Sequence, residues 1–186
     1  MDLLRLPKMA FSAEEGWPQL VKIHPTVQAV FAYVVLPLSL LPPALLYYAG
    51  NHYGDSFVAG FASKPWGAIA AVFFAAEMLT FAWMGWFIKQ VAETGNLSID
   101  NHDAYLLAAI APIPLWVSSL SLLVPNPVFN ALVALAALVL SCGLIYQGIH
   151  ALCHTREDVT AASIVYAVIG AGLAAWALLL TLIVAL

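Results

Sequence analysis

Five long apolar stretches occupy most of this chain and constrain what it can fold into. Each is close to the roughly 20 residues that a helix needs to cross the hydrocarbon core of a bilayer. Lipid offers no hydrogen bonds to the backbone, so such a stretch lies there as a helix. The sequence therefore predicts an all-α integral membrane protein with five transmembrane helices. We expect these helices at residues 27–49, 67–89, 104–124, 128–150 and 163–186.

The composition agrees with this fold class, because 63% of the residues are apolar and only 9% are charged. A soluble domain carries about 25% charged residues. We expect one membrane domain at 27–186, without a separate soluble domain. The preceding residues 1–26 mix apolar and charged side chains and are predicted to form an amphipathic segment at the membrane interface.

The positions of the basic residues predict the orientation of the chain. Cytoplasmic loops of membrane proteins carry an excess of Lys and Arg. If the N-terminus is cytoplasmic, Lys64 is the one basic residue of six that lies on the outer side. We therefore expect a cytoplasmic N-terminus and a C-terminus outside. The basic residues form no run, so nucleic acid is not an expected partner, whereas membrane lipids are.

Glu77 lies near the middle of the second predicted helix, among apolar residues. An ionisable residue at this depth is costly and marks a functional site by default. Burial in apolar surroundings disfavours the charged form, so we expect a protonated carboxyl. Prolines in the first and third spans would free backbone carbonyls, and two serines lie at about the same depth. The candidate site comprises Glu77, Ser39, Pro37, Pro112, Pro114 and Ser141.

Two interpretations of Glu77 remain open. In the first, its carboxyl donates to a carbonyl freed by proline and only fastens two helices together. In the second, it is a proton or cation site of a small transporter or channel. Five helices alone are expected to enclose little space, so transport would be helped by a homo-oligomer.

Four tryptophans have two possible places, namely the core and the membrane interface. They are Trp66, Trp83, Trp86 and Trp116. Trp66 and Trp86 lie near predicted span ends, where aromatic belts form.

A cluster of possible metal ligands lies on the predicted cytoplasmic side. His150 and His154 are one helical turn apart with Cys153 between them, and His102 and Asp103 lie on the same side. His and Cys at such spacing can hold zinc. The pattern lacks a second closely spaced ligand pair, so solvated histidines are the alternative. Apart from this zinc or other divalent metal, we expect no cofactor.

The chain also lacks the usual signatures of catalysis. We find no glycine-rich phosphate loop, no nucleophile serine after a strand and no paired carboxylates. The sequence therefore predicts that the protein is not an enzyme.

Several short motifs together resemble a known family. They are Gly16-Trp17 with His24-Pro25, the run Leu36-Pro37-Leu38-Ser39-Leu40-Leu41-Pro42-Pro43, Tyr48-Ala49-Gly50 with Tyr53-Gly54-Asp55, and Asp103-Ala104-Tyr105 leading to Ala111-Pro112. On these motifs the chain resembles the Yip membrane family (Ypt-interacting proteins), most closely its bacterial inner-membrane branch.

The resemblance implies five spans, a cytoplasmic N-terminus and a bacterial inner-membrane location. In eukaryotes it also implies interaction with small GTPases. Eukaryotic members carry an Asp-Leu-Tyr-Gly-Pro motif before the membrane domain, and this chain has no such motif. We therefore expect the fold to transfer but not the GTPase partner.

These observations lead to three functional hypotheses. The first is a scaffold, or a factor that organises lipids or partner proteins, acting through self-association or partner helices. The second is a small transporter or channel that uses Glu77. The third and weakest is a metal-binding membrane protein that uses the histidines.

Overall fold

The computed structural model describes Trp17, Leu20 and residues 23–95, 97, 99–153 and 158–185. Within this part of the chain it contains five helical segments long and apolar enough to cross a membrane. The predicted all-α membrane fold is thereby confirmed. The five segments are Val27–Phe57, Trp66–Thr94, Asn101–Leu123, Pro127–Leu152 and Ala162–Thr181.

Its prolines divide the first span into short helical pieces. These are α3 (Val27–Val30), a π-helical turn (Phe31–Val35), α4 (Leu36–Ser39) and α5 (Leu41–Phe57). Proline lacks the N–H that would continue the regular ladder, which explains why the breaks fall beside Pro37 and Pro42. The last piece extends to Phe57 with a kink at Tyr53, whose backbone angles (φ -150°, ψ 27°) are not helical, although the sequence predicted an end at residue 49. Asn51 and His52 lie within this extension, and their side chains bond to the carbonyls of Tyr47 and Tyr48.

The second span is one continuous helix, whereas the third span is broken by proline. The second is α6 (Trp66–Thr94), and the third consists of α7 (Asn101–Ile110), α8 (Ile113–Ser118) and the 3-10 turn η4 (Ser119–Leu123). The Asp100 side chain caps α7 by accepting from the backbone N–H of Asp103 at 2.7 Å. The break between α7 and α8 falls at Pro112.

The last two spans are the long helices α9 (Pro127–Cys153) and α10 (Asp158–Ala185). Asn126 caps α9 through its side-chain oxygen, which accepts from the backbone N–H of Phe129 at 3.0 Å. The short Pro-Asn-Pro connection makes α8 and α9 antiparallel neighbours, and they pack against each other. The C-terminal turn of α10 contacts the loop before α6. There the Lys64 ammonium donates to the carbonyls of Ile183 and Val184.

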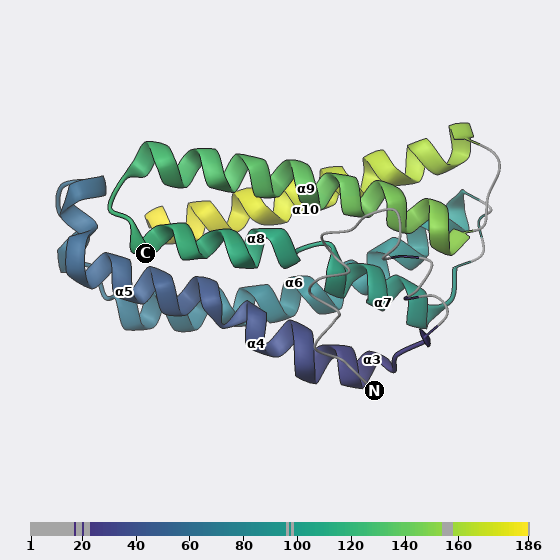
Figure 1. Ribbon diagram of the computed structural model, residues 1–186, viewed down its shortest axis with the longest axis horizontal. Coiled ribbons are helices and arrows are strands. Elements are labelled where there is room, and N and C mark those ends of the chain that lie inside the picture. The colour runs from purple at the N-terminus through teal and green to yellow at the C-terminus, as the bar shows by residue number, and fades with distance from the viewer. Residues whose placement is uncertain are drawn as a thin grey trace.

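The five spans form a ring of packed helices. The second span (α6) contacts α5, α7 and α10, while α9 contacts α8 and α10. The ring is closed by packing of α5 against η4. Figure 1 shows the helices side by side along the long axis, with the start of α3 and the end of α10 at opposite ends of the bundle.

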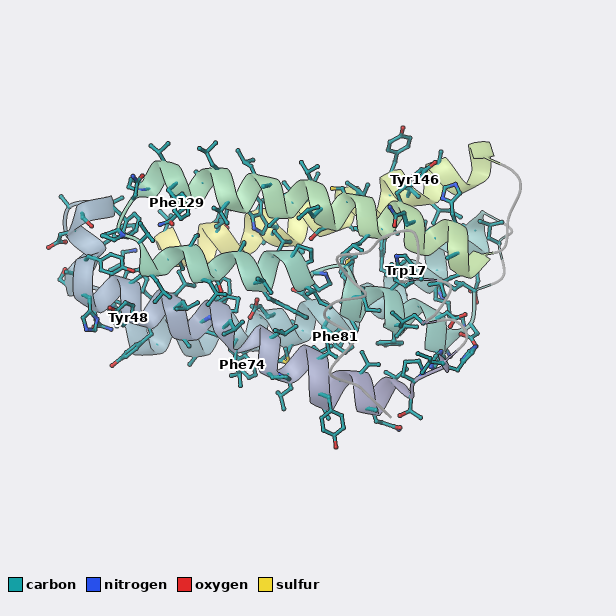
Figure 2. All side chains as sticks on the ribbon, in the orientation of Figure 1. Trp17, Tyr48, Phe74, Phe81, Phe129 and Tyr146 are labelled. Carbon is teal, nitrogen blue, oxygen red and sulfur yellow. The ribbon has the colours of Figure 1, made fainter. Side chains whose placement is uncertain are left out.

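Two residues of the N-terminal segment belong to the core of the protein. Trp17 and Leu20 are each 3% exposed and pack in the same apolar cluster as Leu107 of α7. A Cβ at Gly148 would lie 2.7 Å from the Trp17 ring and 2.6 Å from the Leu107 side chain. Figure 2 shows the Trp17 side chain between α7 and α9. Trp17 and Leu20, which the sequence placed at the membrane interface, are therefore part of the bundle core. The other residues before Ile23 lie outside the described part.

Candidate intramembrane binding site

The helix ring surrounds a cavity of about 600 Å³, lined by residues from all five spans. Most of the lining is Ala, Leu, Ile, Phe and Met. The expectation that five helices alone enclose little space was therefore wrong. The proline break in the third span and the many alanines of α9 leave room that straight helices with larger side chains would fill.

Glu77 reaches this cavity from α6 and is 8% exposed. Its Oε1 atom accepts a hydrogen bond from the indole N–H of Trp116 on α8, at 3.1 Å. Its Oε2 atom is buried and has no hydrogen-bond partner among the described residues. The sequence predicted a proline-freed carbonyl as the partner of Glu77. The structure corrects this, because the third span turns an indole donor toward the carboxylate.

The tryptophans divide between the core and the surface. Trp116 and Trp66 are 5% and 4% exposed, whereas Trp83 and Trp86 are exposed. Trp66 lies at the start of α6, where a belt residue was conceivable, but it is buried and its indole N–H donates to the Phe61 carbonyl at 2.7 Å. Trp116 was an open candidate in the sequence, and no motif marked it as the partner of Glu77.

Ser141 reaches the same cavity from α9 and is 4% exposed. Its hydroxyl has no hydrogen-bond partner among the described residues. Because α6 packs on α5, α7 and α10, and α9 packs on α8 and α10, Glu77 and Ser141 enter from different walls. Asn130, near the start of α9, is a third lining residue with a buried side-chain oxygen that has no partner among the described residues. Near mid-helix, the lining thus includes two residues with a buried, unpartnered oxygen, Glu77 on α6 and Ser141 on α9.

The other predicted site residues have different places. Pro112 lines the cavity, and Pro114 is buried in α8. Ser39 is fully buried, but its hydroxyl donates to the Leu36 carbonyl at 3.2 Å. Neither Ser39 nor Pro37 is among the residues that line the cavity. The structure therefore brings Glu77, Ser141 and Pro112 together and leaves the first-span pair outside.

The lining of the cavity reaches the outer surface of the bundle on α9 and α10. Three of its lining residues, Leu135, Leu173 and Leu180, are also exposed on the outer surface. In a membrane this surface faces the acyl chains of lipid. Among the described lining residues, Glu77 is the one acidic or basic side chain. An apolar molecule can therefore enter from the bilayer, whereas a charged one would meet a single carboxyl and no cation.

The predicted metal ligands are placed differently. His150 lies on α9, where its Nδ1 atom is 2.8 Å from the Tyr146 carbonyl. His154 and the side chain of Cys153 lie outside the described part. His102 and Asp103 instead cluster with His24, with one ligand atom from each within 4.8 Å of the others.

Both ring nitrogens of His102 already face acceptors. Nδ1 is 3.0 Å from the Asp103 carboxylate, and Nε2 is 2.7 Å from the Pro25 carbonyl. Since both partners only accept, the ring satisfies them best with a proton on each nitrogen, a state that cannot bind metal. A metal would have to displace one of these bonds, and the zinc hypothesis stays a prediction. His24 was missed because nothing in its local sequence links it to His102.

The chain also matches a known protein family. Residues 7–179 match the Yip1 domain model. The chain belongs to the Yip1 domain family. This confirms the family resemblance that the sequence motifs indicated. No curated protein and no solved structure matches the chain significantly.

The Yip1 domain of this chain uses several of its motif residues for close packing. Gly50 of α5 is buried, and a Cβ there would overlap the Trp66 ring. A Cβ at Gly85 of α6 would likewise overlap the ring of Tyr105, whose hydroxyl donates to the Ala82 carbonyl at 3.3 Å. These contacts hold α5 and α7 against α6, the helix that carries Glu77.

Proposed function

We propose that this Yip-family membrane protein is a non-enzymatic, lipid-organising factor of the bacterial inner membrane. In this proposal its central cavity takes up one lipid molecule from the surrounding bilayer. The observation that carries the proposal is the apolar cavity of about 600 Å³ with exposed lining residues on its α9 and α10 side.

Size and chemistry both support a lipid as the occupant. Sites for drug-sized ligands span about 300–1,000 Å³ and are mostly apolar with a few placed polar groups. This cavity fits that description, and its buried polar side chains include those of Glu77, Trp116, Ser119 and Ser141. Three of its lining leucines are exposed on the outer surface, where bilayer lipids are the molecules present at the highest concentration.

Filling the cavity tests this proposal. Ala134 lines the cavity from α9, whereas Ala136 on the same helix is exposed and is not a lining residue. Ala134→Phe is expected to reduce co-purifying lipid by at least about fivefold, because the ring occupies the volume a chain would use. Native mass spectrometry of protein released gently from detergent measures the retained lipid. Ala136→Phe is the matched control and should retain lipid like the wild type. Unchanged lipid in Ala134→Phe would contradict the proposal.

A small transporter or channel is the second candidate function. It is favoured by Glu77, which lines the cavity and whose buried Oε2 atom has no partner among the described residues. Intramembrane carboxyls of this kind serve as proton relays in pumps and transporters. The absence of a second charged group among the described lining residues makes this candidate weaker than lipid uptake.

Flux measurements separate the two candidates. If Glu77 carries protons or cations, Glu77→Gln should abolish flux into vesicles that contain the purified protein and a pH-sensitive dye. Glutamine still offers an oxygen to Trp116, so folding should be retained. Absence of flux in the wild type, or equal flux in both proteins, would exclude Glu77-dependent transport.

Self-association remains part of the proposal for a scaffold role. Gly170 and Ala174 lie one helical turn apart on α10, and both are exposed. A Cβ at Gly170 would meet nothing within 4 Å. Small residues at this spacing let two membrane helices approach closely. This face is therefore the one that we propose for contact between copies.

A further inference from the structure

We infer that the cavity binds a single-chain lipid with an uncharged hydroxyl head, and that this hydroxyl lies between Glu77 and Ser141. The inference rests on the proposed uptake of lipid and adds the chemical class of the ligand. It follows from the two buried polar atoms near mid-helix, the charge of the lining and the volume.

One carboxyl oxygen of Glu77, Oε2, has no hydrogen-bond partner among the described residues. Trp116 satisfies Oε1, while Oε2 is buried, and Glu77 is one of the residues that line the cavity. Buried polar groups in proteins nearly always have a hydrogen-bond partner, and an exception needs an explanation. A hydroxyl both donates and accepts, so it can pair with Oε2 whether the carboxyl is ionised or protonated.

Ser141 differs from the other buried serines of the described residues in the hydrogen bonding of its hydroxyl. Ser39 and Ser119 donate to the carbonyls of Leu36 and Trp116, at 3.2 Å and 2.6 Å. Such bonds to the preceding turn are the usual way in which a helical serine is satisfied. Ser141 makes no such bond, although it is 4% exposed. Its hydroxyl is thus unpaired at a residue that lines the same cavity as Glu77.

The charge of the lining restricts the head group. No Lys, Arg or His is among the described lining residues. A phosphate head would be buried opposite a carboxyl with no cation to compensate it, which is strongly unfavourable. A cationic amine would pair with Glu77, but desolvating both charges in an apolar cavity costs about as much as the pairing returns. An uncharged hydroxyl avoids both costs.

The cavity dimensions restrict the tail. The available volume is about 600 Å³, and Glu77 and Ser141 lie near the middle of α6 and α9, whereas Asn130 lies near the start of α9. A two-chain phospholipid has its head at the interface, so its polar group would not reach this depth. A single-chain alcohol can lie with its hydroxyl at Glu77 and its chain along the apolar wall toward the opening.

Photo-cross-linking of a long-chain alcohol tests the inference. The probe is hexadecanol with a diazirine in its chain, titrated against the full-length protein in mild detergent. Glu77→Met and Ser141→Ala should each weaken binding about fivefold, the effect of losing one hydrogen bond. Glu77→Gln should bind within about threefold of wild type, because its amide still pairs with a hydroxyl. Ser39→Ala is the matched control and should bind like wild type.

The outcomes separate this inference from the proposed function. Equal binding of the same chain without its oxygen, or tighter binding of the matching long-chain amine, would overturn the hydroxyl class. If Glu77→Met and Ser141→Ala both bind the probe like wild type, the hydroxyl class is also wrong. If Ala134→Phe blocks binding of the probe in that case, the proposed lipid uptake still holds. If Ala134→Phe does not block the probe, lipid uptake itself is wrong. Thermal unfolding of each variant identifies any that has failed to fold, and Ser141→Ala tests the site if Glu77→Met does not fold.

Discussion

Gly50→Ala is expected to destabilise the bundle by about 2 kcal/mol, within the range for overpacking a well-filled interior. A Cβ at Gly50 would overlap the indole ring of Trp66. That ring is 4% exposed and donates to the Phe61 carbonyl at 2.7 Å. It therefore cannot move aside without losing packing or its hydrogen bond. Reversible unfolding in mixed micelles measures the change in the free energy of unfolding.

Gly143→Ala is the matched control, because it makes the same change within α9. A Cβ at Gly143 meets nothing within 4 Å. Alanine is favoured over glycine in a helix interior by about 0.5–1 kcal/mol, so this variant should be slightly more stable than wild type. If the two variants have equal stability, the close approach of Gly50 to Trp66 does not matter to the fold.

Length and polarity were enough to predict the membrane fold. The five apolar stretches had to be helices, since lipid leaves the backbone no other partners. The end of the first helix was less predictable. A polar stretch after residue 49 resembled a loop, but Asn51 and His52 turn their side chains to carbonyls of the preceding turn, and the helix continues until a kink at Tyr53.

The candidate site was predicted in part. Glu77 stands out in a sequence because an acidic residue is costly in an apolar span. Its partner does not stand out, since a tryptophan can lie equally well in the core or at an interface. Which face of each helix turns inward depends on contacts such as Gly85 with Tyr105 and Gly148 with Trp17. The cavity and the roles of Trp116 and Ser141 follow from those rotations and could not be read from spacing alone.

The Trp116 and Glu77 pair makes the second prediction with a large effect. Trp116→Phe removes the donor and leaves the Glu77 carboxyl buried without a partner, whereas Glu77→Met leaves the indole N–H without an acceptor. An orphaned buried polar group costs about 1–3 kcal/mol. Each single variant should therefore lower the free energy of unfolding by about 2 kcal/mol or more. In Trp116→Phe, part of this loss comes from the cavity that the smaller ring leaves.

The double variant Trp116→Phe with Glu77→Met decides whether this bond fastens the bundle. Removing both partners leaves no orphaned polar group, so the double variant should lose less stability than the sum of the single variants, by about 1–3 kcal/mol. The same unfolding experiment on all four proteins measures this coupling. Additive losses within about 0.5 kcal/mol would mean that the two side chains are energetically independent. A strong coupling would show that Trp116 holds Oε1 in place, and this is what leaves Oε2 free for whatever enters the cavity.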